Sequence, residues 1–270
     1  MDFETVHVET DGALGRLTLQ RPERLNAIGA SMMREIRAAA GWFDARPEVR
    51  VVVVSGAGRA FSAGADLKDS PVAGAVPRDG GASWSERREV GQLGLRMADA
   101  VEQMRAVTIA QVHGYAVGGG LVLMAACDLR VAAEDAVFSI PEVDLGIPLA
   151  WGGIPRLVRE IGPALTKELV MTCRRFTPAE AKAAGFVNRV VAADDLAREV
   201  DALAAEVAAK PTVPVTITKE HVNAVARTMG AGHTAFADGD VLLGSILDPE
   251  SLAAASRYRE AALGGGRRKD

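Results

Sequence analysis

The stretch from Tyr115 to Asp128, YAVGGGLVLMAACD, constrains the fold of this chain more than any other. It follows directly on an apolar segment, Val107 to Val112, that we expect to be a buried strand. Its three glycines, Gly118 to Gly120, therefore lie at a strand-to-helix junction. No nucleophile or metal ligand stands next to these glycines, which are flanked by Val117 and Leu121, so any chemistry at this junction must come largely from the main chain.

Strand and helix patterns alternate in the first half of the chain. Thr5 to Glu9 and Leu14 to Leu19 alternate as strands do, and Asp11-Gly12 between them is typical of a hairpin turn. Ala30 to Phe43 carries apolar residues at helical spacing. Val51 to Val54 is an unbroken β-branched run, which indicates a strand buried on both faces. These patterns predict a mixed α/β fold.

Helical patterns dominate the second half. A helix is expected over Ser85 to Arg105, and Thr177 to Glu180 forms a capping box with proline at the first helical position. Phe186 to Val191 predicts a strand. We expect residues 1–194 to form the core with the functional site, and residues 195–270 to form a C-terminal helical region.

Composition excludes several classes of protein. A chain of 270 residues with 49% hydrophobic residues can bury a full core. Its net charge of −4 and lack of long basic runs argue against nucleic acid as a partner. Its acidic start is unlike a secretory signal, and no apolar run is long enough to span a membrane, so we expect a soluble cytoplasmic protein. The two cysteines and four histidines show no spacing typical of a disulfide framework or a metal site.

Two glycine loops could form a binding site for an oxygen atom. Gly118 to Gly120 and Ala63-Gly64-Ala65-Asp66 each come after a buried strand, where unpaired N–H groups can point at a ligand. If the two loops face each other, they provide two N–H donors for one oxygen, which is an oxyanion hole. The alternative is that the glycines only relieve crowding between helix and sheet.

Two other functions fit this part of the sequence less well. Gly56 to Gly58 follows a strand as in dinucleotide-binding proteins, but Phe61 stands where the third glycine would be, and a loop follows instead of a helix. Ser62 lies in a near match to the nucleophile elbow of serine hydrolases. Its base would have to be His113 or His233, and no spacing favours either one.

The segment SIPEVDLGIPLAWGGIPRL brings two carboxylates, Glu142 and Asp144, among apolar neighbours. Burial of a carboxylate raises its pKa, which suits a group that accepts and returns protons. Alternatively, Glu142 caps the helix near Trp151 or forms a salt bridge, and Asp144 serves as a turn or capping residue.

Several motifs together resemble the enoyl-CoA hydratase/isomerase (crotonase) superfamily. They are QRPERLNAI, AFSAGADL, HGYAVGGGLVLMAACDLRVA, IPEVDLGI, FTPAEAKAAGFVNRVV and TKEHVNAV, in this order. The resemblance covers nearly the whole chain. It implies an α/β core of repeated ββα units wound into a spiral, followed by C-terminal helices that hold a homotrimer, often doubled to a hexamer.

The resemblance also implies roles for particular residues. The N–H groups of Ala65 and Gly119 would hold the thioester oxygen of an acyl-CoA substrate. The loops around them, with Ala63, Gly64, Asp66 and Gly118, would bind the substrate. Coenzyme A would be part of that substrate, with no permanently bound cofactor.

Further residues are candidates for binding particular parts of the substrate. Arg24 and Lys68 are candidates for the phosphates of coenzyme A, because these anions need cations. Trp151, Trp84 and the loop 71–81 are candidates for shaping the acyl pocket, or for packing alone.

The chain departs from the hydratases of this family at one catalytic position. Those enzymes carry two glutamates. Here Glu142 matches the second, but Val122 stands at the first, and valine can neither hold nor deprotonate water. Single-glutamate Δ3,Δ2-enoyl-CoA isomerases show the same pattern, so we expect this activity.

Other activities stay open at this point. The aspartates of dienoyl-CoA isomerases would fall at Val122 and Ala150. A hydratase or dienoyl-CoA isomerase of relaxed mechanism remains an alternative, as does an acyl-CoA binding protein without catalysis. Asp144 could also serve as a second carboxylate for acyl-CoA hydrolysis or decarboxylation.

Overall fold

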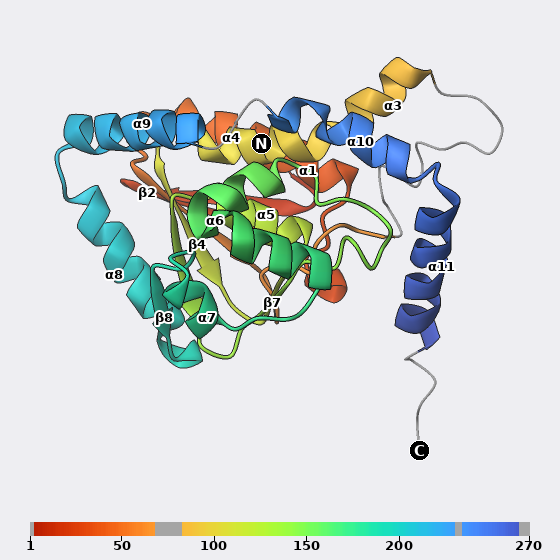
Figure 1. Cartoon of the computed structure of the whole chain (residues 1–270). Helices are drawn as coiled ribbons and strands as arrows, with labels where there is room; N and C mark the ends of the chain where they lie inside the picture. Colours follow the sequence, from red (N-terminus) through yellow and green to blue (C-terminus); the bar gives the residue numbers. More distant parts are fainter. Residues whose placement is uncertain (1–2, 68–82, 230–233, 265–270) are drawn as a thin grey trace.

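The computed structural model describes residues 3–67, 83–229 and 234–264 and has a layered α/β architecture (Figure 1). The larger sheet has the strand order β1-β2-β3-β4-β6-β8. The first pair is antiparallel and the other pairs are parallel. Its strands are β1 (Val6–Asp11), β2 (Leu14–Leu19), β3 (Val51–Gly56), β4 (Val107–Val112), β6 (Leu129–Ala133) and β8 (Arg189–Val191).

The central strand β3 is buried on both faces, as its run of valines predicts. Val52 and Val54 belong to the hydrophobic core on one side of the sheet, and Val51 and Val53 belong to the core on the other side. Helices α1 (Ala30–Asp44), α4 (Leu93–Glu102) and α5 (Gly119–Ala126) cover the first side, and α8 (Leu196–Ala208) covers the second. The expected hairpin, the helix from Ala30 and the strand over Val107 to Val112 are all confirmed.

A second, short parallel sheet runs beside the first one. It consists of β5 (Tyr115–Val117) and β7 (Val137–Ser139). Two isolated β-bridges extend it: Ser62 pairs with Ala116 of β5, and Phe176 pairs with Phe138 of β7. Successive passes of the chain therefore add one strand to the large sheet and a short extended segment to the small one. This is the spiral of repeated units that the resemblance implies.

One expected helix is divided in two, and another begins at its predicted cap. The helix expected over Ser85 to Arg105 is divided into α3 (Trp84–Gly91) and α4 at Gln92, whose side-chain amide donates to the Phe236 carbonyl oxygen. Ser83 and Glu86 form a capping box at the start of α3. In α7 (Pro178–Ala183) the Thr177 hydroxyl accepts a hydrogen bond from the Glu180 N–H, as its motif predicts.

The strand expected over Phe186 to Val191 is shorter than predicted. Only Arg189–Val191 forms β8. The N–H groups of Phe186 and Val187 donate to the Ala181 carbonyl oxygen at the end of α7, so they are not available to the sheet. Both side chains are nevertheless buried. The apolar pattern therefore predicted burial correctly and strand pairing incorrectly.

The remaining helices lie around this core (Figure 1). They are α6 (Gly153–Thr172), α9 (Thr212–Met229), α10 (Asp238–Ser245) and α11 (Pro249–Gly264), with short 3-10 helices η1 (Pro22–Arg24), η2 (Ala193–Asp195) and η3 (Thr234–Ala237). The described residues beyond 194 lie mostly in helices, and the first of these, α8, packs on the sheet. None of the helices within the described residues is long and apolar enough to cross a membrane.

Candidate active site

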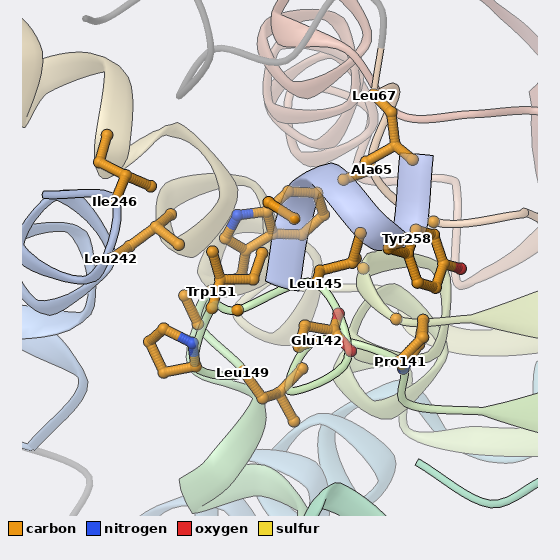
Figure 2. A pocket seen from close by; sticks show the side chains of 18 of the residues that line it. Ala65, Leu67, Pro141, Glu142, Leu145, Leu149, Trp151, Leu242, Ile246 and Tyr258 are labelled. Atoms are coloured by element: carbon orange, nitrogen blue, oxygen red, sulfur yellow. The ribbon is translucent and has the colours of Figure 1, made fainter. Parts of the chain in front are cut away.

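A pocket of about 340 Å³ lies where the two glycine loops meet the segment 141–151 and the C-terminal helices. Figure 2 shows the side chains that line it. The loops contribute Ala63, Gly64, Ala65, Leu67, Val117, Gly118 and Gly119. The segment contributes Pro141, Glu142, Leu145, Gly146, Ile147, Pro148, Leu149, Ala150 and Trp151. The helices contribute Val90, Gly91, Val122, Leu242, Ile246, Ser251, Leu252, Ala255, Tyr258 and Arg259.

The two glycine loops lie directly against each other. Gly64 has a φ of +90°, and a Cβ at this position would lie 2.5 Å from the Val117 carbonyl oxygen and 3.5 Å from the Gly119 nitrogen. A side chain at residue 64 would thus separate the loops. Glycine at this position allows the close approach that an oxyanion hole requires.

Backbone hydrogen bonds hold Ala65 in position. The Ile28 N–H donates to the Gly64 carbonyl oxygen at 2.7 Å, and the Asp66 N–H donates to the Ile28 carbonyl oxygen at 3.0 Å. The Ala65 N–H itself has no acceptor within the described residues. Ala65 lines the pocket, so this donor is available to a ligand.

Gly119 presents a second N–H donor. It is the first residue of α5, where a helix leaves its N–H groups unpaired. The preceding residue, Gly118, has a φ of +49° and donates its own N–H to the Ser139 carbonyl oxygen at 2.9 Å. The structure therefore brings Ala65 and Gly119, both predicted to act through main-chain N–H groups, to the wall of one pocket.

Glu142 lies beside these donors. A Cβ on Gly118 would lie 2.5 Å from the Glu142 Oε1 atom, so the carboxylate rests against the Gly118 main chain. Glu142 is 9% exposed, and its Oε2 atom is buried without a hydrogen-bond partner. Burial raises the pKa of the Glu142 carboxyl to about 7.

The structural alternatives for Glu142 do not agree with these contacts. Its main-chain carbonyl oxygen accepts from the N–H groups of Leu145 and Ile147, but its carboxylate forms no ion pair with any described residue. A buried carboxylate with an unpartnered oxygen costs stability, and such groups cluster at functional sites. Among the described residues that line the pocket, Glu142 is the only carboxylate.

Asp144 lies outside this pocket. Its side chain is exposed and lines a neighbouring groove between the segment 143–148 and helices α10 and α11. In the turn that follows Pro141, Glu142 and Leu145 face the pocket whereas Val143 and Asp144 face outwards. The structure therefore does not bring Asp144 together with Glu142 as a second acid or base.

Asp66, predicted to bind the substrate, and Arg24, predicted to bind the phosphates of coenzyme A, do not line the pocket. Asp66 is 4% exposed and pairs with Arg21 Nη1 at 2.9 Å and with Arg24 Nη1 at 3.4 Å. The Asp66 side chain therefore holds the loop against η1 and does not line the pocket. Arg24 is partly occupied by this ion pair but remains half-exposed. Lys68 and the loop 71–81 lie outside the described residues.

Val122 and Trp151 both line the pocket, as predicted. Val122 is buried on α5, at the position where the resemblance places the first glutamate of the hydratases. Trp84 is exposed and does not line the pocket. The sequence reasoning missed Leu242 and Tyr258, because nothing in the local pattern of α10 and α11 shows that these helices reach the site.

The arrangement does not support two functions considered from the sequence. Ser62 is fully buried; its hydroxyl donates to the Asn26 carbonyl oxygen at 2.8 Å and accepts from the Gly64 N–H at 3.1 Å. His113 Nε2 contacts the Gly58 carbonyl oxygen at 2.9 Å and not Ser62, and His233 lies outside the described residues. These contacts argue against Ser62 as a nucleophile. Gly56 to Gly58 leads into a loop and not directly into a helix, so it does not match the fingerprint of dinucleotide-binding proteins.

Comparisons with known proteins give the same family throughout. A family profile described as enoyl-CoA hydratase/isomerase matches residues 9–250. A probable enoyl-CoA hydratase of Mycobacterium bovis is 38% identical over 226 residues, which are 83% of this chain and 82% of the relative. The peroxisomal Delta(3,5)-Delta(2,4)-dienoyl-CoA isomerase of Arabidopsis thaliana is 36% identical over 222 residues, 80% of each chain.

A solved structure agrees with this result. An enoyl-CoA hydratase/isomerase from Mycobacterium paratuberculosis superposes with a TM-score of 0.83 at 27% identity, and the match covers 95% of this chain and all of the other. The expected fold is thereby confirmed. With a matching profile over most of its length and relatives above 30% identity, this chain belongs to the enoyl-CoA hydratase/isomerase family and has the crotonase fold.

Proposed function

We propose that this protein is a Δ3,Δ2-enoyl-CoA isomerase in which Glu142 alone carries the proton. The observation that supports this proposal is the buried Glu142 carboxylate, unpaired and the only carboxylate among the described residues that line the pocket. It lies beside two main-chain N–H groups, those of Ala65 and Gly119. A base and an oxyanion hole are the two components that enolate chemistry needs.

The reaction follows from these groups. The Glu142 carboxylate removes a proton from C2 of a 3-enoyl-CoA, and the electron pair moves to the thioester oxygen to give a dienolate. The N–H groups of Ala65 and Gly119 stabilise this oxygen, and loss of one such donor typically costs about 3 kcal/mol of barrier. The same carboxyl group then returns the proton to C4, which leaves the double bond between C2 and C3. The proton is conserved and no further reactant is needed.

Hydration is the second candidate, because several relatives are named enoyl-CoA hydratases. Adding water to C3 needs a group that holds and deprotonates the water while another group delivers the C2 proton. Val122 occupies the place of one of these groups, and Asp144 faces away from the pocket. These contacts favour isomerisation over hydration.

One assay separates the candidates. A 3-enoyl-CoA and a 2-enoyl-CoA are offered to the wild type, to Glu142→Gln and to Val122→Glu. We expect isomerisation by the wild type, a loss of about a hundredfold to ten-thousandfold in kcat for Glu142→Gln, and a gain of hydration for Val122→Glu. Asp144→Asn is the matched control and should keep wild-type isomerisation, because its carboxylate lies outside the pocket.

The other outcomes are equally informative. Undiminished turnover by Glu142→Gln would remove this residue from the mechanism. Hydration by the wild type without isomerisation would favour the hydratase. Binding of acyl-CoA without turnover of either thioester would identify a binding protein.

A further inference from the structure

The indole of Trp151 lines the pocket, and its position depends on two glycines from different helices. A Cβ at Gly94 on α4 would overlap the five-membered part of the ring, and a Cβ at Gly119 on α5 would overlap the six-membered part. Figure 2 shows the ring between Leu242 and Ile246 on one side and Glu142 and Leu145 on the other. The indole therefore fills the slot between two helices and forms one wall of the pocket.

The main chain keeps this ring in place. Trp151 has a φ of +59°, in the left-handed region that bulky residues rarely adopt. Arg156 Nη1 donates to the carbonyl oxygens of Trp151 and Gly152 at 3.3 and 3.2 Å, and Arg156 Nη2 pairs with the carboxylates of Asp99 and Glu102. An uncommon backbone conformation held by so many contacts is typical of a functional position.

The wall lies next to the proposed chemistry. The indole contacts Gly119, whose N–H is one proposed donor to the thioester oxygen, so it borders the space for the carbons attached to that thioester. Val122, Leu145 and Leu149 are apolar residues that line the same pocket as Glu142. A substituent on these carbons would therefore meet the ring.

We propose that Trp151 is the specificity-determining residue of this pocket, and that it restricts the site to acyl-CoA thioesters with an unbranched chain at the reacting carbons. This inference rests on the proposed function, because it takes an acyl-CoA to be the ligand of the pocket. Gly94 contacts the ring from α4. Because Gly94 has no side chain, the indole can lie close to α4 and stays out of the space for the acyl chain.

The test compares 3-hexenoyl-CoA with its 3-methyl derivative. The ratio of kcat/KM for the branched over the unbranched thioester should be low in the wild type. It should rise by about tenfold or more in Trp151→Phe and further in Trp151→Ala, since one extra methyl group in a tight apolar pocket discriminates by 10-fold or more. Trp84→Phe, at the exposed tryptophan outside the pocket, should leave the ratio unchanged.

A second pair of variants moves the ring in the opposite direction. Gly94→Ala should push the indole into the acyl space and lower kcat/KM even for 3-hexenoyl-CoA. Adding Trp151→Phe to Gly94→Ala should restore much of this loss, because the smaller ring leaves room for the new methyl group. This pair also decides the question if Trp151→Ala fails to fold.

A ratio that stays within about twofold of the wild type in both Trp151 variants would overturn the proposal. So would a double variant no better than Gly94→Ala. Failure of the proposed function is recognised separately, by turnover in Glu142→Gln. If the wild type turns over neither thioester, the same ratio is measured as the Kd of hexanoyl-CoA and 3-methylhexanoyl-CoA.

Discussion

At the scale of single residues, the chemistry of the site depends on what surrounds one carboxyl group. Burial raises the pKa of Glu142 to about 7, and no described cation compensates for its charge. A base with a pKa near the working pH balances the fraction ionised against proton affinity. Glu142 therefore has the properties of a group that both takes and returns a proton.

The first residue-scale prediction is a pH dependence of the reaction. In the proposed mechanism Glu142 acts as a base in its ionised form, so kcat/KM for isomerisation should rise as the pH increases through about 7 and then level off. Initial rates with saturating and limiting 3-enoyl-CoA measure this profile. A profile that is flat across this range, or that falls with pH, would contradict the assignment.

The second residue-scale prediction concerns stability. The pKa of Glu142 is raised on folding, so its ionisation destabilises the folded state progressively as the pH rises from the unfolded value to about 7. Glu142→Gln removes this charge. At about pH 8 the variant should be more stable than the wild type by up to about 3 kcal/mol, and the difference should vanish near pH 4. Urea unfolding at the two pH values measures it, and a variant less stable than the wild type at pH 8 would contradict the prediction.

At the scale of secondary-structure elements, the site is built from the segments that follow strands. The loop after β3 and the start of α5 after β5 each carry one donor, and the turn after β7 carries Glu142. The buried Asn26 fixes the first loop, donating to the carbonyl oxygens of Ala57 and Ala60. Ser62 links this loop to the peptide of Gly64.

Removal of the Ser62 hydroxyl tests the role of this loop. Ser62→Ala leaves the Asn26 carbonyl oxygen and the Gly64 N–H without their partner, so the free energy of unfolding should fall by about 1–3 kcal/mol. Turnover should decrease but persist, because the hydroxyl takes no part in the chemistry. Ser256→Ala, at an exposed serine on α11, should change stability by less than about 0.5 kcal/mol. Complete loss of activity in a folded Ser62→Ala protein would point to a catalytic serine.

At the scale of the whole molecule, α9 presents an apolar surface to solvent. Val213, Ile217, Val222, Val225 and Met229 are all exposed along this helix. Lys219 anchors this helix to the core through the Asp128 carboxylate and the Ala106 carbonyl oxygen. Exposed apolar residues that are continuous along one helix mark an interaction surface.

We therefore expect the protein to form the homotrimer or dimer of trimers that its resemblance implies. A charge on the α9 surface should weaken the assembly, so Ile217→Glu should lower the mass measured by light scattering. Glu220→Gln, at an exposed polar residue of the same helix, should leave the mass unchanged. A wild-type protein that is monomeric at micromolar concentration would contradict this expectation.

The local elements of this fold could be predicted from the sequence because they depend on interactions between near neighbours. The β-branched run of β3, the capping residue Thr177 and the glycines at the start of α5 each specify a conformation within a few residues. Family motifs added Ala65, Gly119 and Glu142. The prediction of a strand from Phe186 was wrong, because an apolar side chain indicates burial but not the hydrogen-bond partner of its backbone.

The lining of the pocket, by contrast, was decided by contacts between distant parts of the chain. Asp144 faces away from Glu142, Asp66 pairs with Arg21, and Trp151 fits against Gly94. Leu242 and Tyr258 line the pocket from α10 and α11, which come about a hundred residues after the segment with Glu142 and Trp151. Such contacts follow from how helices and sheets pack in three dimensions, and packing has no period or spacing that a linear pattern could reveal.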